Sequence, residues 1–373
     1  MKKILFILES RASFGYSKNL INILKKNKKY RYKNFITGTH LSKELGNSLT
    51  DVSREKIKLD FIAKFNHLDL SKGISDIIKH TSTALKKFRP DFVIIFGDRI
   101  ELLGVAISCV FNDRLICHVQ AGDKSGHIDD LTRMTLSKLC HIHFPATEAA
   151  KKRLVNLGEE KFRIHKVGAP QLDDIKTKAI TEKSFIYYKK KKIDLLEKKY
   201  LVILQHSVFK DKKNYGEFFE NTIKACLKFN YKIFIIYPNY DPGYKFIINI
   251  VKKYKNRLTI IKHLSRNDFL RLIYFSKTFV GNSSAGILET PSLNVPTVNI
   301  GDRQYKREQN KNIFNCSYKI ADIEKALKRS LYYSENKKRI KNIHGDGKSS
   351  IRIFKILDSI SNNKKFLNKK TTY

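Results

Sequence analysis

Cysteine is scarce in this chain of 373 residues. The five cysteines are odd in number, and no two of them show Cys-x-x-Cys spacing. This pattern predicts neither a disulfide framework nor a zinc site, and it suits a reducing compartment. We therefore expect a cytoplasmic protein.

Long hydrophobic runs are also missing. No stretch reaches the roughly 18 uncharged apolar residues of a membrane helix, so we expect no membrane partner. The N-terminus, MKKILFIL, opens like a signal peptide, but Glu9 interrupts its apolar run early. The run is better explained as a first buried β-strand.

Acidic residues are few as well, with 35 Asp and Glu against 74 Lys and Arg and a formal net charge of +39. Such a charge can indicate nucleic acid as a partner. The basic residues are mostly Lys, however, spread along the chain among Ile, Asn and Tyr, and they form no basic stripe with interleaved aromatic residues. We expect a solvated basic surface that steers an anionic substrate and does not bind nucleic acid.

Short apolar runs, separated by amphipathic segments of helix length such as 73–88, predict buried strands of parallel sheets with crossover helices. The length of the chain suits two domains. The runs form two series: 4–8, 92–98, 114–123, 141–147 and 162–170, then 200–207, 231–239, 257–265, 278–284 and 295–302.

The two series predict an α/β protein of two doubly wound, Rossmann-like domains. We expect an N-terminal domain over 1–180, a C-terminal domain over 195–350, and a helix with a basic tail over 351–373. The charged segment 177–199 is interpreted as the crossing between the domains. Such a pair would face a central ligand cleft at the carboxyl ends of the strands.

The stretch GNSSAGILETPSL (281–293) joins a predicted strand to a predicted helix through small residues. Small residues let a phosphate approach the backbone, and amides and hydroxyls at a helix start bind anions. Ser283, Ser284 and Gly286 would contact a diphosphate, while Glu289 would accept hydrogen bonds from a ribose diol. An ordinary Ser-capped turn is the alternative.

Polar residues also follow the other predicted strands. Asp129 and Arg133 are four residues apart and would share a helix face. Taken singly, each such residue is explained as well by a helix cap, a surface salt bridge or a structural role. Together they lie at strand ends on both sides of one predicted cleft: Asp98, Arg99, Asp123, Asp129, Arg133 and His206.

With these motifs the chain resembles the UDP-N-acetylglucosamine 2-epimerases, specifically their hydrolysing, sialic-acid-pathway branch. The resemblance runs over most of the chain, through RASFGYSKN, GDRIE, HVQAGDKSGHIDDLTR, VGAPQLDDI, QHSV, YPNYDPG and GNSSAGILETPSLNVPTVNIGDRQ. It implies the two-domain GT-B fold, a nucleotide-sugar substrate, no metal or other cofactor, and a homo-oligomer that is a dimer or a tetramer. It also implies removal of the proton at C2, expulsion of UDP from C1, and addition of water to give free N-acetylmannosamine for sialic or other nonulosonic acid synthesis.

The resemblance also implies roles for individual residues. Asp98 and Asp129 match the catalytic carboxylates, Arg133 matches the Arg that follows, and His206 the catalytic or phosphate-side His. Arg99 lies beside Asp98. The nucleotide-side positions would be Arg11, Ser17, Asn239, Ser283, Ser284, Glu289 and Arg303, with the two serines on the diphosphate and Glu289 on the ribose.

One departure from the family pattern concerns the chemistry directly. Many members have a catalytic Glu where this chain has Gln120, and an amide cannot take a proton at neutral pH. We hypothesise that Asp123 covers part of that role, or that the substrate is a modified sugar. Smaller departures are Ala285, where Ser is common, and Met134, where His often follows the Arg.

Two other functions stay open at this point. A GT-B glycosyltransferase would share the phosphate loop and the ribose Glu, but it would have no need of Asp98 and Asp129 around His206. A nucleotide-sugar-binding homologue that has lost catalysis at Gln120 would keep the pocket. The sequence does not decide between UDP and GDP, or the substituents at C4 and C6 of the sugar.

Overall fold

The computed structural model describes residues 1–41, 58–67, 69–125, 129–175, 177–196, 199–208, 214–238, 243–262, 264–336, 340–360 and 364–372. The chain divides into two compact units: residues 1–174 with 344–373, and residues 175–343. Within the described ranges, no helix has the length and apolar character that crossing a membrane requires.

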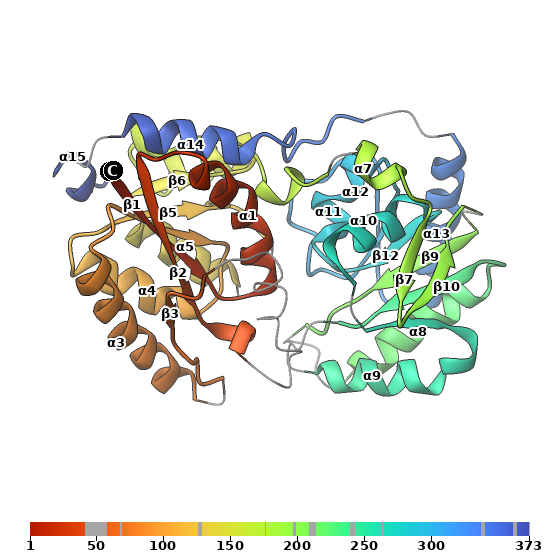
Figure 1. Ribbon diagram of the computed structural model, residues 1–373. Coiled ribbons are helices and arrows are strands. Elements are labelled where there is room, and N and C mark those ends of the chain that lie inside the picture. The colour runs from red at the N-terminus through yellow and green to blue at the C-terminus, as the bar shows by residue number, and fades with distance from the viewer. Residues whose placement is uncertain are drawn as a thin grey trace. The chain divides into compact units, whose positions relative to one another are not determined.

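The first unit is built on a parallel six-stranded sheet with the order β3-β2-β1-β4-β5-β6 (Figure 1). Helices α3, α4 and α5 cover one face, and α1 and α14 cover the other. The strands are β1 (Lys2–Leu8), β2 (Tyr30–Ile36), β3 (Phe61–Ile62), β4 (Phe92–Phe96), β5 (Leu115–Val119) and β6 (Ile142–Phe144). The helices are α1 (Arg11–Lys25), α3 (Leu70–Phe88), α4 (Glu101–Val110), α5 (Asp129–Leu139), α6 (Glu148–Asn156), α14 (Ser349–Ser359) and α15 (Lys364–Leu367).

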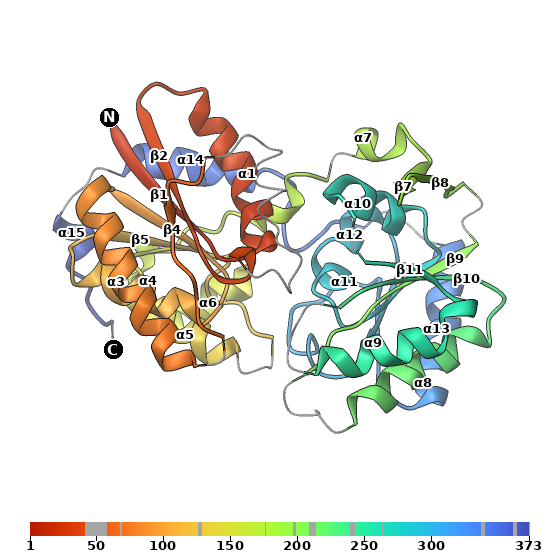
Figure 2. The same ribbon diagram turned by 60° about the horizontal axis from the view of Figure 1, so that its bottom comes forward.

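The second unit repeats this plan, with the order β11-β10-β9-β12-β13-β14. Helices α8, α9 and α13 pack on one face, and α10 packs on the other with the hairpin β7-β8 (Figure 2). The strands are β7 (Phe185–Tyr188), β8 (Lys191–Asp194), β9 (Tyr200–Leu204), β10 (Lys232–Ile236), β11 (Thr259–Ile261), β12 (Thr278–Gly281), β13 (Thr297–Ile300) and β14 (Ile313–Cys316). The helices are α7 (Thr177–Thr181), α8 (Tyr215–Leu227), α9 (Tyr244–Lys253), α10 (Arg266–Tyr274), α11 (Ala285–Leu288), α12 (Thr290–Leu293) and α13 (Ile320–Glu335).

The predicted strands are present with one exception. Residues 162–170 were expected to be a strand, but they begin in the 3-10 helix Lys161–Arg163 and make a single bridge, Ile164 to His143. Among the described strands of the two six-stranded sheets, three were not predicted, namely β2, β3 and β14, because β2 is only partly buried, β3 has two residues and β14 is a half-exposed edge. Apolar runs are a signal of full burial, and these strands lack it.

The segment 177–199 also contains more structure than expected. It forms α7 and the antiparallel hairpin β7-β8, both within the second unit. Lys189 and Lys190 occupy the two-residue turn with φ of 48° and 63°. Two consecutive residues with positive φ fit the hairpin turn, but Asn and Gly are its usual residues, so the Lys pair gives no hairpin signal.

Helix α14, near the C-terminus, packs in the first unit beside α1 (Figure 2). Lys2 Nζ donates to the carbonyl oxygens of Leu357 and Ile360, at 2.8 and 2.9 Å, where α14 ends. At the other end, the Asp173 carboxylate accepts hydrogen bonds from the amides of Ser349 and Ser350 at 2.9 and 2.7 Å. A cation at the C-terminus and a carboxylate at the N-terminus both complement the helix dipole.

Candidate active site

One candidate residue in each unit follows a strand at the topological switch point of the sheet. Strand order reverses between β1 and β4 in the first unit and between β9 and β12 in the second. In doubly wound sheets the ligand crevice lies outside the carboxyl ends of the strands at such a point. Asp98 follows β4 at the first point, and His206 follows β9 at the second.

Asp98 is paired with Arg133 of α5. The guanidinium Nη2 bonds to Asp98 Oδ2, and Nη1 lies 2.6 Å from Asp130 Oδ1 and 3.0 Å from the carbonyl oxygen of Asp123. The Arg133 side chain is 3% exposed, whereas that of Asp98 is 24% exposed. Arg133 therefore holds one solvent-accessible carboxylate from a buried position, with a charge that does not vary with pH.

The structure brings Asp130 into this cluster, although the sequence had pointed to its neighbour. Asp130 Oδ1 accepts hydrogen bonds from the amide and the hydroxyl of Ser125, both at 2.9 Å. Asp129 is the first residue of α5, and its side chain lies outside the described part of the chain. Asp130 thus orients Arg133 and ties the start of α5 to the preceding loop.

Gln120 occupies an unusual backbone position directly after β5. Its φ is 63°, a conformation that few residues other than Gly adopt. Its amide N–H donates to the Phe144 carbonyl at 3.0 Å, and its side-chain Nε2 donates to Gln171 Oε1 at 3.2 Å. Two residues later Gly122 (φ 72°) packs so closely on α6 that a Cβ would lie 2.4 Å from the Ala150 carbonyl oxygen. The QAGD motif is therefore a tight turn that fixes Gln120 at the strand end.

Two buried carboxyl groups were not predicted: Glu9, which directly follows β1, and Glu101, the first residue of α4. Arg99 Nε lies 2.7 Å from Glu101 Oε1, with the Glu101 side chain fully buried and that of Arg99 35% exposed. Burial, with the charge of Glu101, raises the pKa of Glu9 to about 8 against the opposing charge of Arg99. Glu9 therefore keeps its proton at neutral pH.

Glu9→Gln should change how stability depends on pH. In the folded protein Glu9 holds its proton up to about pH 8, but in the unfolded chain only up to about 4.5. The folded state binds more protons between these values, so wild-type stability falls as pH rises through this window. We expect the variant to gain roughly 3–5 kcal/mol over wild type between pH 4.5 and 8.5.

Chemical denaturation at pH 4.5, 6.5 and 8.5 measures this difference. Glu182→Gln, at an exposed glutamate, serves as the control and should show a constant small offset. An equally constant offset for Glu9→Gln would contradict a proton held by Glu9.

His206 is held by a buried network in the second unit. The His206 amide donates to Asn282 Oδ1 at 2.7 Å, and the His206 carbonyl accepts from Asn282 Nδ2 at 2.9 Å. The Tyr215 hydroxyl donates to the same carbonyl and accepts from Asn282 Nδ2 at 2.9 Å. Burial, with the charge of Arg303, holds the pKa of His206 well below its ordinary value. The imidazole is therefore neutral, and Arg303 supplies the positive charge beside it.

The small residues of the loop after β12 serve close packing as well as possible anion binding. A Cβ on Gly286 would lie 2.8 Å from Thr297 Cγ2 and 3.0 Å from Phe279 Cδ1, so this Gly lets α11 approach the sheet. Its N–H donates to the Ser283 carbonyl at 3.0 Å. These contacts account for Gly286 without a ligand. Ser284 is half-buried and remains a candidate for contact with an anion.

Glu289 and Arg303 frame the same loop. Glu289 is 5% exposed and pairs with Arg266 at the start of α10. Arg303 Nη1 donates to the Asn282 carbonyl at 3.2 Å. A carboxylate has acceptor sites for more than one partner, so Glu289 can accept a hydrogen bond from a ligand hydroxyl while it pairs with Arg266.

Three predicted positions near the nucleotide are not supported by described contacts. Ser17 is fully buried, and its hydroxyl donates to the Phe14 carbonyl within α1 at 2.9 Å, so it does not suit ligand contact. Asn239 lies outside the described residues. Arg11 begins α1, but its side chain is outside the described part.

Sequence reasoning missed Glu9, Glu101, Asp130, Tyr215 and Asn282 in these networks. Asn282 and Asp130 were adjacent to residues singled out, and their position beside a strand end or helix start was the available signal. Tyr215 comes from another helix and gave none. Within the described ranges, no three His, Cys, Asp or Glu side chains are grouped so as to hold a metal ion.

Comparison with known proteins places these features in context. The family model described as UDP-N-acetylglucosamine 2-epimerase matches residues 22–358. The chain is 31% identical over 387 residues, covering all of both chains, to the UDP-N,N'-diacetylbacillosamine 2-epimerase (hydrolyzing) of Legionella pneumophila. It is 31% identical over 335 residues, covering 88% of each chain, to the UDP-N-acetylglucosamine 2-epimerase of Neisseria meningitidis.

A solved structure shares the fold. The UDP-GlcNAc 2-epimerase from Neisseria meningitidis, bound to UDP-GlcNAc, superposes with a TM-score of 0.78 at 19% identity, over 96% of this chain and 100% of that one. Together with the two six-stranded parallel sheets, this confirms the predicted GT-B architecture.

Proposed function

Since the chain belongs to the UDP-N-acetylglucosamine 2-epimerase family, we propose that it is a hydrolysing nucleotide-sugar 2-epimerase. Its substrate would be UDP-N-acetylglucosamine or a related UDP- or GDP-linked N-acetylated sugar, and its products the free nucleotide and an N-acetylmannosamine-type sugar. The observation that carries this proposal is the accessible Asp98 carboxylate held by buried Arg133 at the switch point of the first sheet.

The reaction divides into an elimination and a hydration. A base removes the proton at C2, the C1–O bond breaks, and its electron pair leaves with the nucleotide diphosphate, which gives a glycal. Water then adds its oxygen at C1, and a proton returns to C2 on the opposite face. Asp98 would exchange the proton, as carboxylates do in such steps, and Asp129 would be the second carboxylate.

We assign nucleotide binding to the second unit. Ser283, Ser284 and Arg303 would contact the diphosphate, and Glu289 the ribose. His206, being neutral, would donate a hydrogen bond to the leaving phosphate and not a full charge. The protein would be a cytoplasmic homo-oligomer, and its product would feed synthesis of sialic or another nonulosonic acid.

The 31%-identical Legionella relative, which aligns over its full length, is named for UDP-N,N'-diacetylbacillosamine, so the substrate panel should include a 2,4-diacetamido sugar. The protein is incubated with UDP-N-acetylglucosamine, with UDP-N,N'-diacetylbacillosamine and with the GDP-linked form of the latter sugar. Free nucleotide is quantified by phosphorus NMR. Release of UDP or GDP from one of them supports the proposal. Tight UDP binding with no release from any would reject it.

A second candidate, a binding protein without catalysis, is favoured by one observation. Gln120, at the position where the family has a Glu, is 7% exposed, and its side-chain amide donates to Gln171. This buried hydrogen bond suits a structural role. The same panel decides between the two functions.

Asp123→Asn tests whether Asp123 compensates for Gln120. Asp123 is half-buried, three residues after Gln120, and its carbonyl oxygen is bound by Arg133. If its carboxylate takes part in proton transfer, turnover should fall about 100-fold or more with little change in KM. Turnover equal to wild type would remove Asp123 from the mechanism.

A further inference from the structure

The C-terminal segment of the chain ends against the helix that carries Arg133. Lys369 Nζ donates to the carbonyl oxygens of Ser137, Lys138 and Cys140, each at 2.7 Å. Ser137 and Lys138 belong to the last turn of α5, and Cys140 directly follows the helix. Helix ends leave such carbonyls unpaired, and an ammonium has three donors to offer them. Lys369 therefore caps α5 from a position more than 200 residues away in sequence.

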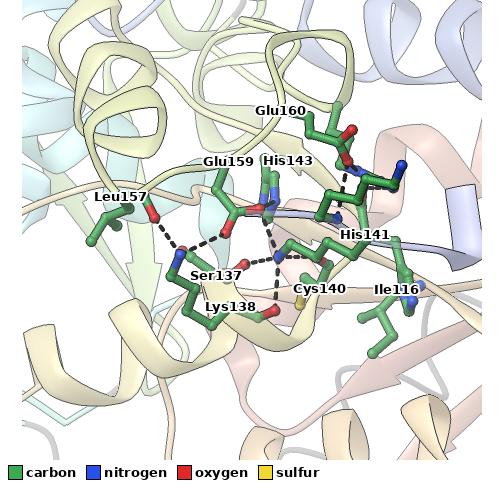
Figure 3. A network of polar contacts seen from close by, with 12 residues as sticks. Ile116, Ser137, Lys138, Cys140, His141, His143, Leu157, Glu159 and Glu160 are labelled. Carbon is green, nitrogen blue, oxygen red and sulfur yellow. Dashed lines mark hydrogen bonds and ion pairs between the residues drawn. The ribbon is translucent and has the colours of Figure 1, made fainter. Parts of the chain in front are cut away.

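A buried carboxylate holds Lys369 in this position. Lys369 Nζ lies 2.6 Å from Glu159 Oε2, and the Glu159 side chain is fully buried. Figure 3 shows Glu159 between His143 and Lys138, whose Nε2 and Nζ lie 2.9 and 3.7 Å from its oxygens. Burial alone would raise the pKa of Glu159, but the hydrogen bonds and charges of His143 and Lys369 outweigh it and lower the pKa. Glu159 is thus a fixed anion beneath the ammonium.

A second cation fixes the backbone of the tail itself. The Arg163 guanidinium donates to the carbonyl oxygens of Phe366 at 2.6 Å, Asn368 at 2.9 Å and Lys365 at 3.1 Å. Arg163 is fully buried. The tail is therefore specifically ordered around Arg163, which sets the direction from which Lys369 reaches α5.

The capped end of α5 is one turn from the Arg133 that binds Asp98. The Ser137 hydroxyl donates to the Arg133 carbonyl at 2.9 Å, and the Ser137 carbonyl is one of those that Lys369 binds. The opposite end of α5 is tied by Asp130 to Ser125. An 11-residue helix spans about 16 Å, so loss of the cap lets the C-terminal end of α5 shift or tilt relative to the sheet.

We propose that Lys369 is a positioning residue, which fixes α5 along its axis and so holds the Arg133 guanidinium against Asp98. The tail thereby becomes part of the active-site support, although it does not contact the reacting groups. This inference rests on the proposed function for its kinetic consequence, but not for its structural one. A misplacement of about 1 Å at reacting groups costs on the order of 100-fold in rate.

Lys369→Met removes the cap while keeping a side chain of similar length. We expect kcat to fall about 10- to 100-fold with KM within twofold. Lys370→Met, at the exposed neighbour whose backbone amide donates to Glu160 Oε2 at 3.4 Å, should retain wild-type kcat. Retention of wild-type kcat by folded Lys369→Met would overturn the proposal.

A double variant separates positioning from general destabilisation. If Lys369 acts through Arg133, adding Lys369→Met to an Arg133→Lys background should lower kcat by less than twofold further. Loss of the full single-variant factor in that background would mean that Lys369 acts elsewhere, and would overturn the proposal. Kinetics are compared at a temperature where circular dichroism shows all variants folded.

Amide hydrogen exchange tests the structural part without turnover. In Lys369→Met the amides of residues 133–139 should exchange at least tenfold faster, whereas those of α4 should not change. If the wild-type protein turned over no nucleotide sugar, the proposed function would fail, yet this measurement would still decide the role of Lys369. Unchanged exchange in α5 would overturn it.

Discussion

Asp98→Asn is expected to lower kcat by about 100- to 10,000-fold with little effect on folding. An Asn side chain keeps the shape and can still accept a hydrogen bond from Arg133, but it cannot take or return a proton at neutral pH. Arg133 also keeps its bond to Asp130. The loss should therefore fall on the chemical step, while UDP affinity stays near that of wild type.

Steady-state kinetics and calorimetric titration with UDP measure the two effects separately. Asp113→Asn is a matched control, because Asp113 is exposed and precedes β5, so it lies at the amino ends of the strands, whereas Asp98 lies at their carboxyl ends. It should match wild type in both measurements. Asp98→Asn with wild-type kcat would exclude Asp98 as the group that exchanges the proton.

Asn282→Ala should destabilise the second unit by roughly 3–4 kcal/mol. Asn282 is fully buried. Its side chain accepts a hydrogen bond from the His206 amide and donates to the His206 carbonyl and to the Tyr215 hydroxyl. Truncation removes three hydrogen bonds at once and leaves a void between β9 and β12. Because the network also positions His206 and Arg303, turnover should fall at least tenfold.

Urea unfolding, with turnover measured under native conditions, tests this expectation. Asn336→Ala is the control, because Asn336 is exposed and its side-chain Nδ2 donates to the Tyr332 carbonyl at 3.0 Å. Its cost should stay below about 1 kcal/mol. A loss for Asn282→Ala no larger than this would show that the network does not hold the strand ends together.

The sequence predicted the position of candidate residues best where a polar residue follows a buried strand. Asp98 and His206 both follow apolar runs, and within each sheet the parallel strands bring such positions to the carboxyl ends of the strands. The glycines were ambiguous, since small residues serve packing as well as phosphate binding. Gly286 belongs to the packing class because Phe279 and Thr297 fill the space of a Cβ. This distinction requires the neighbours in space.

Contacts distant in sequence were not predictable from local patterns. The C-terminal segment was expected to be a separate helix and basic tail, yet Lys2, Asp173 and Arg163 hold it within the first unit. Its lysines had no distinguishing sequence feature in a chain rich in Lys. Burial of Glu159 selects Lys369 among them, and burial emerges only from the fold.

The most direct test of the account is proton exchange at C2. The protein is incubated in deuterated water with the nucleotide sugar that it cleaves, or with each member of the panel, and the products are followed by proton NMR. We predict free nucleotide together with an N-acetylmannosamine-type sugar that carries deuterium at C2. Free nucleotide with an unexchanged C2 proton, and with the original configuration at C2, would contradict elimination and leave simple glycosidic hydrolysis in its place.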